Sequence, residues 1–218
     1  MSNSKISFKK KRVRSLFLAS DKKGISREDI EDELITNGME YIQMRLPVEK
    51  ITPDFEENIK KKVEQNILKA KVREASENDL ESIVYLHNRS WMTSCTPFSP
   101  LTIQSLKSLF KFPEIKMLIA KVYGIDAGFV ILDLEGSNNE YGVIAGLGVL
   151  PRFQRKGLGT IIGMIAWNYL KEKGIKELRC EVYKENKVSY NFIKSLGFEE
   201  FDTKIYKRED FELSNRSN

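Results

Sequence analysis

The sequence has few of the residues that build metal centres or disulfide frameworks. Its 218 residues include one histidine, His87, and two cysteines, Cys95 and Cys180, without the spacing of a metal or redox motif. A histidine-rich metal site is therefore excluded, and we expect no metal and two reduced thiols. No run of about 18 apolar residues occurs, and the apolar stretch near the N-terminus is too short for a secretory signal. We therefore expect a cytoplasmic protein without a membrane span.

The positive charge of the chain is unevenly distributed. The formal net charge is +5, and six cations without any acid lie in the first fourteen residues: Lys5, Lys9, Lys10, Lys11, Arg12 and Arg14. Such an arm could contact RNA, DNA or an acidic partner. A solvated tail is the simpler interpretation, so nucleic-acid binding is left open and is not favoured.

A change of pattern near Ala70 divides the chain into an N-terminal appendage, residues 1–69, and a main domain, residues 70–218. In the appendage we expect a helix over 25–35, a turn at 37–38, a strand over 40–48 and a helix over 53–70. The apolar pattern here is sparse. It predicts a small α+β unit that leans on the main domain or on a partner.

Strands and helices alternate in the main domain. We expect strands over 71–75, 116–123, 126–135, 140–150 and 176–183, and helices over 76–91, 101–110, 161–173 and 185–196. Two last strands, 198–201 and 204–213, are expected to form a hairpin. The pattern predicts a mixed α/β sheet with helices on both faces, large enough to bury a core at 41% apolar content.

The stretch QRKGLGT, residues 154–160, lies between an apolar strand and a long helical pattern. It supplies two glycines, two cations and a hydroxyl: Gly157, Gly159, Arg155, Lys156 and Thr160. If the strand runs directly into the helix, the first backbone N–H groups of the helix are open to a phosphate, which the glycines allow to approach. The spacing is neither that of a Walker loop nor that of a dinucleotide fingerprint. A tight turn with solvated cations is the alternative.

The same stretch resembles a known family. Residues 154–159 match the (Q/R)xxGx(G/A) pyrophosphate loop of the GNAT superfamily of acyl-CoA N-acyltransferases, and the strand LGVLP before it also matches. Asn186 stands eleven residues before Gly197-Phe198, which is the family's Asn…GF spacing. The resemblance covers roughly Lys71 to Leu213. It implies a GNAT-like mixed, splayed β-sheet and a loop that holds the pyrophosphate of coenzyme A.

The resemblance also implies that acetyl-CoA lies between two parallel strands that splay apart, here residues 140–150 and 176–183. The backbone N–H of Val149 would bind the thioester oxygen, and a well-aimed donor of this kind is worth about 10²–10³ in rate. Gly146 and Gly148 suit a bulge or a close backbone approach, with helix packing as the alternative. The residues that the resemblance assigns to the cofactor are Leu147, Gly148, Val149, Gln154, Arg155, Lys156, Gly157, Leu158, Gly159, Thr160 and Asn186.

Glu181 is the candidate general base. It shares one strand face with Arg179 and Tyr183, opposite Cys180. It heads the stretch EVYKEN, and the ribosomal-protein alanine N-acetyltransferases carry their catalytic glutamate in a similar EVRxxN stretch. The resemblance therefore makes Glu181 the base, acting directly or through a water. An ion pair with Arg179 or with a lysine is the alternative.

The general acid departs from the family pattern. The usual tyrosine stands seven residues after the asparagine, where this chain has Ile193. Tyr190, one turn earlier on the same helix, is the substitute that we assign to catalysis. Tyr183 is the other candidate, and a packing role is open for both.

The acceptor is the least defined part of the prediction. The stretch IYKREDFEL is similar to the closing strand of protein N-terminal acetyltransferases, which favours a protein or peptide α-amine. A small-molecule amine, such as a polyamine or an aminoglycoside, is the alternative within the enzyme class. A non-catalytic acyl-CoA-binding regulatory module is the alternative outside it. A homodimer is left open.

Overall fold

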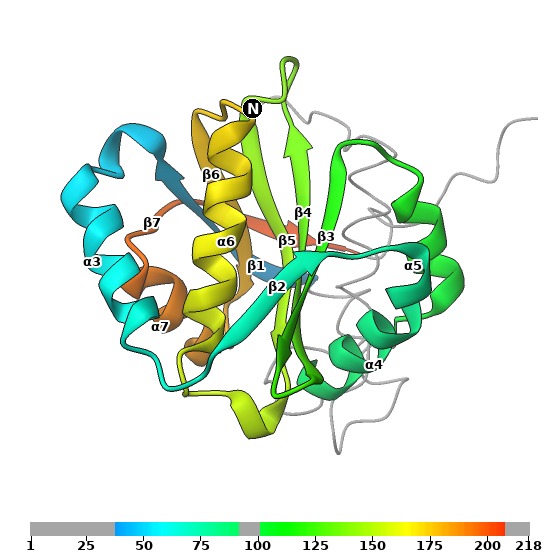
Figure 1. The fold of residues 1–218 in the computed structure, drawn as a ribbon. Coiled ribbons are helices and arrows are strands. Elements are labelled where there is room, and N and C mark those ends of the chain that lie inside the picture. The colour runs from blue at the N-terminus through cyan, green and yellow to red at the C-terminus, as the bar shows by residue number, and fades with distance from the viewer. Residues whose placement is uncertain (1–37, 92–100, 208–218) are drawn as a thin grey trace, which may run out of the picture.

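The computed structural model describes residues 38–91 and 101–207 (Figure 1). The helix expected over 25–35, Cys95 and the end of the last predicted strand lie outside these residues. The elements, in chain order, are β1 Met39–Pro47, the 3₁₀-helix η1 Val48–Lys50, α3 Pro53–Glu64, β2 Ala70–Glu74, η2 Glu77–Asp79, α4 Leu80–Trp91, α5 Ile103–Phe110, β3 Ile115–Val122, β4 Ile125–Glu135, β5 Tyr141–Val149, η3 Pro151–Phe153, α6 Leu158–Glu172, β6 Glu177–Tyr183, α7 Lys187–Ser195 and β7 Glu199–Tyr206.

The described strands form one mixed sheet in the order β2-β3-β4-β5-β6-β1-β7. Within the described residues, β5 and β6 are the parallel pair and the other neighbours run antiparallel. Helices α4 and α5 cover one face, while α3, α6 and α7 cover the other (Figure 1). The predicted mixed α/β sheet with helices on both faces is confirmed.

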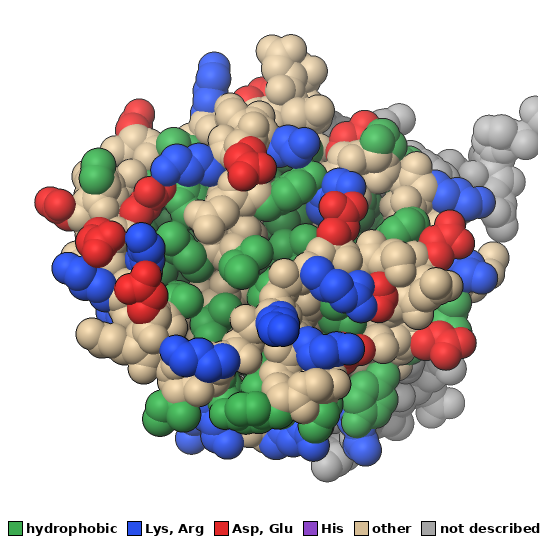
Figure 2. Space-filling model, in the orientation of Figure 1, with side chains coloured by type: hydrophobic (Ala, Val, Ile, Leu, Met, Phe, Trp, Pro, Cys, Tyr) green, Lys and Arg blue, Asp and Glu red, His purple; other side chains and the backbone are tan. Residues whose placement is uncertain are grey.

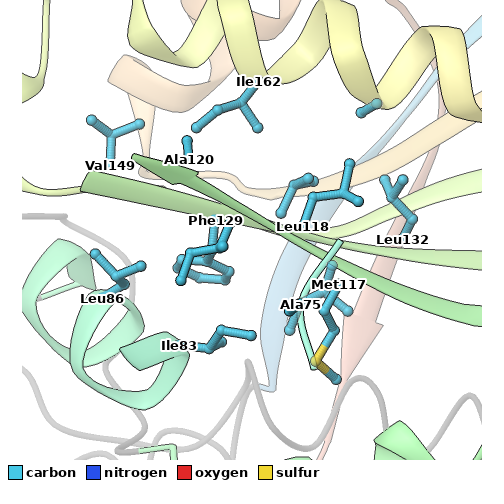
Figure 3. Close-up of a cluster of buried hydrophobic side chains, with 14 of the residues drawn as sticks. Ala75, Ile83, Leu86, Met117, Leu118, Ala120, Phe129, Leu132, Val149 and Ile162 are labelled. Atoms are coloured by element: carbon cyan, nitrogen blue, oxygen red, sulfur yellow. The ribbon is translucent and has the colours of Figure 1, made fainter. Parts of the chain in front are cut away.

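The core lies on both sides of β4. Eight consecutive residues of this strand, 127–134, are buried, which is the pattern of a strand that is covered on both faces. On one side, Phe129 lies beside Ile83 and Leu86 of α4; on the other, Leu132 and the neighbouring strand face α6, which contributes Ile162 (Figure 3). The sheet is therefore packed on both faces next to β5, the neighbour of β4 that borders the candidate site.

Strand β1 is part of this sheet although it precedes residue 70. It pairs antiparallel with β6 from Tyr41–Tyr183 to Pro47–Glu177, and with β7 on its other edge. Met44 and Leu46 belong to the main hydrophobic core, and Met44 is fully buried. The role of the appendage was left open between packing and a partner. The described residues 39–47 pack into the sheet of the main domain, and a partner role for the appendage stays a prediction.

Two expected elements differ from the structure. The predicted C-terminal hairpin is wrong over the described residues, because 199–206 form one strand, β7. Its antiparallel neighbour is β1, so the strand need not fold back on itself to find a partner. The helix expected over 53–70 ends at Glu64, where Asn66 turns the chain by accepting a hydrogen bond from the backbone N–H of Leu68 at 2.7 Å.

Candidate active site and cofactor loop

The two parallel strands separate after four residue pairs. Residues 141–144 of β5 pair with 177–180 of β6, and the last pair is Ile144–Cys180. Beyond it, β5 continues to Val149 along β4, and β6 continues to Tyr183 along β1. The sheet therefore opens between β5 and β6, as expected for a splayed sheet. The backbone groups along this opening can bind a ligand.

The wall that β5 gives to this opening is shaped by a bulge. Ile131 of β4 pairs with Gly146 and Leu132 pairs with Ile144, so Ala145 is an extra residue. At the end of the strand, the N–H of Leu150 donates to Ala127 on β4. Because successive N–H groups of a strand alternate in direction, the N–H of Val149 points towards the opening. This is the direction that a donor to the thioester oxygen needs.

Gly148 is buried against the Phe129 ring of β4 and against α4. A Cβ built on it would lie 2.4 Å from the Phe129 ring and 3.0 Å from the Ser90 hydroxyl oxygen. Packing of the backbone against β4 and α4 therefore requires glycine here, and it keeps the strand close to α4. Helix packing was the alternative that the sequence left open for Gly148, next to a bulge or a close backbone approach.

The connection from β5 to α6 is longer than the direct passage that we expected. Leu150, the turn η3 and residues 154–157 intervene before α6 begins at Leu158. Within it, the Gln154 side-chain amide donates to the carbonyl of Val149 at 2.9 Å. Gln154 therefore ties the loop to the end of β5, a contact that residue spacing does not show.

The first turn of α6 is open to an anion. Its N-cap is Gly157, with a left-handed φ of 79°, and no side chain caps the helix there. The backbone N–H groups of the first turn therefore lack a side-chain acceptor at this cap, and the helix dipole adds positive potential. Arg152, Arg155 and Lys156 are exposed nearby, and cations gather around the start of α6 in Figure 2. A diphosphate fits these groups.

The two glycines of this loop lie close to neighbouring parts of the protein, while their expected role in admitting a phosphate stays a prediction. A Cβ on Gly157 would lie 1.8 Å from the amide nitrogen of Asn66, and a Cβ on Gly159 would lie 3.2 Å from the Phe192 ring on α7. Both glycines thus accommodate neighbouring parts of the protein. Leu158 is buried, and Thr160 lines a small apolar cavity between α3, α6 and the residues that follow α7.

Glu181 is the first residue of β6 beyond its last pair with β5. The Tyr206 hydroxyl donates to its carboxylate and lies 2.8 Å from both oxygens. Tyr206 is fully buried at the end of β7, two strands away from β6. Arg179 donates instead to Glu177 at 2.5 Å, so it is not the ion-pair partner considered for Glu181. The register through β1 that brings Tyr206 to Glu181 could not be read from the sequence.

The other predicted residues of β6 and α7 occupy different places. The Asn186 side chain accepts a hydrogen bond from the N–H of Ser189 and caps α7. The Tyr190 hydroxyl donates to Glu200 on β7. Tyr183 borders the opening on the same face of β6 as Glu181 and is buried. Its ring lies 5.5 Å, centroid to centroid, from the ring of Tyr41 on β1. The catalytic and cofactor-binding roles of these residues stay predictions.

Comparison with known families identifies the class. A model described as the acetyltransferase (GNAT) family matches residues 80–198, more than half of the chain. The chain therefore belongs to the GNAT acetyltransferase family, whose members act on amines with acetyl-CoA as the acetyl donor. The matched region excludes β1, α3 and β7. No curated protein matches the sequence.

Several solved structures share the fold. An aminoglycoside N-acetyltransferase AAC(6')-Iy, in complex with CoA, is 21% identical with a TM-score of 0.53, covering 66% of this chain and 97% of its own. The ribosomal-protein-S18-alanine N-acetyltransferase from Escherichia coli is 21% identical with a TM-score of 0.52, covering 62% and 80%. PaiA N-acetyltransferase from Thermoplasma acidophilum, in complex with coenzyme A, is 24% identical with a TM-score of 0.53, covering 63% and 99%. These identities show the fold alone.

The comparisons give no support to the nucleic-acid contact or the homodimer that the sequence left open. Among the described helices, none combines the length and apolar character needed to cross a membrane. The described residues contain no cluster of histidine, cysteine, aspartate or glutamate side chains suited to a metal ion.

Proposed function

We propose that this protein transfers an acetyl group from acetyl-CoA directly to a primary amine, and that the acceptor is the N-terminal α-amine of a protein or peptide. The observation that carries the proposal is the position of Glu181. It is the first residue of β6 past the point where β5 and β6 part, beside the strand whose Val149 N–H points into the same opening. These positions support the proposal that Glu181 acts as the acid–base group and the Val149 N–H as the oxyanion donor in one opening.

The chemistry assigned to Glu181 is removal of a proton from the attacking amine, directly or through a water. The amine nitrogen forms a bond to the acetyl carbon, the carbon–sulfur bond breaks, and the thiolate leaves. The Val149 N–H stabilises the negative charge that develops on the carbonyl oxygen. Tyr206 holds the Glu181 carboxylate in place through its hydroxyl. Tyr190 is the proposed donor of a proton to the thiolate, with Tyr183 as the alternative.

The acceptor class is supported by the pKa of amines and by the similarity of IYKREDFEL to the closing strand of protein N-terminal acetyltransferases. A protein α-amine has a pKa of about 7.7–8, so roughly one molecule in ten is neutral at pH 7. A lysine amine, with a pKa of about 10.4, is neutral only about once in 2,500 molecules. A single carboxylate base suits the former better. Small-molecule amines stay as the second candidate, because solved aminoglycoside acetyltransferases share the fold.

The test is thiol release from acetyl-CoA with a peptide library, polyamines and aminoglycosides, followed by mass spectrometry of the product. We expect acetylated peptide N-termini, and we expect Glu181→Gln to lower kcat about 10²-fold. Glu172→Gln, an exposed glutamate at the end of α6, is the matched control and should retain activity. Tyr190→Phe and Tyr183→Phe identify the acid by which of them lowers kcat.

Two results would contradict the proposal. Tight coenzyme A binding without turnover on any amine would identify a binding module instead. Turnover confined to polyamines or aminoglycosides would keep the enzyme class and reject the protein acceptor.

A further inference from the structure

We propose that Asn66 is a positioning residue for the diphosphate of coenzyme A, because it fixes the loop that precedes α6 from outside the region that the family model matches. The inference rests on the proposed placement of the diphosphate at that loop. Asn66 lies between α3 and β2, and the family match begins only at residue 80.

The contact of Asn66 with the loop uses both ends of its side-chain amide. The amide nitrogen donates to the carbonyl oxygen of Lys156 at 2.9 Å, and the amide oxygen accepts from the N–H of Leu68 at 2.7 Å. The second bond orients the side chain for the first. The backbone carbonyl of Lys156 is thereby fixed at the residue immediately before the N-cap of α6.

The loop is built around this contact. The amide nitrogen of Asn66 lies only 1.8 Å from the position that a Cβ on Gly157 would take. The close approach of Asn66 therefore requires glycine at position 157. Arg155 and Gly157 both have left-handed φ values, of 55° and 79°. The left-handed conformation is unfavourable for a residue with a Cβ, so Arg155 needs support from its surroundings. Asn66 supplies that support one residue away.

Helix α3, which precedes Asn66, is itself anchored to α6 and to the residues that follow α7. Glu56 of α3 accepts hydrogen bonds from Trp167 and Lys171 of α6, each at 2.7 Å. The Phe55 ring lies 3.3 Å from the Cβ position of Gly197, after α7. Between these contacts, hydrophobic side chains of α3 and α6 line the apolar cavity, and green side chains gather there in Figure 2. Asn66 therefore extends from a fixed support.

A loop held in its binding conformation loses less entropy when it takes the ligand, so preorganisation raises affinity. Removing Asn66 should weaken the binding of the nucleotide half of the cofactor. It should leave the chemical step unchanged, since Glu181 and the opening between β5 and β6 lie on other elements. The role is thus visible as a change in the acetyl-CoA KM that is separate from kcat.

The experiment compares the full chain with Asn66→Ala and Asn66→Asp by calorimetry with coenzyme A, with 3'-phosphoadenosine 5'-diphosphate as its nucleotide half, and with pantetheine. Asn66→Asp keeps the acceptor for Leu68 and loses the donor to Lys156. We expect both variants to bind coenzyme A and the nucleotide about 3- to 10-fold more weakly. The acetyl-CoA KM should rise by the same factor, with kcat and the acceptor KM unchanged. Asn168→Ala, an exposed asparagine on α6, is the control.

The outcomes separate this inference from the proposed function. Wild-type protein that does not bind coenzyme A rejects the proposed cofactor site itself. Wild-type binding with unchanged affinity in both Asn66 variants rejects only the positioning role. The positioning role is also rejected if kcat and the unfolding temperature both fall while the acetyl-CoA KM does not rise selectively. That result would indicate a general structural role for Asn66.

Discussion

At the scale of single residues, some side chains around the candidate site can be picked out from the sequence, while others are brought there only by the fold. Glu181 and Gln154 could be predicted, because each lies in a short stretch with a known family pattern. Tyr206 and Asn66 could not be assigned their contacts, since they reach Glu181 and Lys156 from 25 and 90 positions away in sequence. Long-range partners of this kind leave no local signal.

His87 gives a residue-scale prediction about pH. It is fully buried on α4 and stacks on Trp91 with ring centroids 4.4 Å apart. Burial lowers the pKa of His87 to about 4, whereas an unfolded histidine has a pKa of about 6.5. Above pH 6.5 both states are neutral at this residue. Between pH 6.5 and 4 the unfolded state takes up the proton first, so stability falls as the pH is lowered.

We expect this histidine to contribute a loss of about 2–3 kcal/mol in the free energy of unfolding between pH 7.5 and 4.5. The measurement is urea unfolding of wild type and of His87→Leu at both pH values. Titration of the carboxylates lowers the free energy of unfolding of both proteins, and the wild type should lose about 2–3 kcal/mol more than the variant. Equal losses in the two proteins would show that His87 titrates alike in the folded and unfolded states.

At the scale of elements, helices and strands with regular patterns were predictable, while the pairing of strands was not. The alternation in residues 40–48 predicted a strand, which is confirmed as β1. Nothing in those residues indicates that the strand inserts between β6 and β7, because pairing depends on which edges the rest of the sheet leaves open. The expected hairpin was wrong for the same reason: β7 finds its partner in β1.

The position of β1 predicts that the described residues before residue 70, 38–69, unfold together with the main domain. Met44 is fully buried in the shared core. Met44→Ala should therefore lower the free energy of unfolding by about 2–5 kcal/mol. Both tryptophans, Trp91 and Trp167, lie after residue 70, so their fluorescence reports on the main domain.

The control is Glu49→Ala, an exposed residue of η1 close to β1. It should leave the transition in place. A Met44→Ala protein whose tryptophan transition coincides with that of the wild type would mean that β1 does not contribute to the stability of the domain.

At the scale of the whole molecule, the fold brings three elements from different parts of the chain around one opening. We propose that β5 supplies a backbone donor, that β6 supplies Glu181, and that the first turn of α6 supplies N–H groups for the diphosphate. The N-terminal segment completes the assembly through β1, α3 and Asn66. The family could be predicted from sequence, because its pattern rests on residues close together in the chain, and the same residues give the proposed cofactor loop. The support that the N-terminal segment gives them could not.

The most direct measurement is a crystal structure of the protein with coenzyme A. We expect the diphosphate at the backbone N–H groups that begin α6, and the thiol end between β5 and β6 beside the Val149 N–H, with the Glu181 carboxylate across the opening. A diphosphate bound away from α6, or β5 and β6 paired along their full length with the cofactor bound elsewhere, would contradict the account.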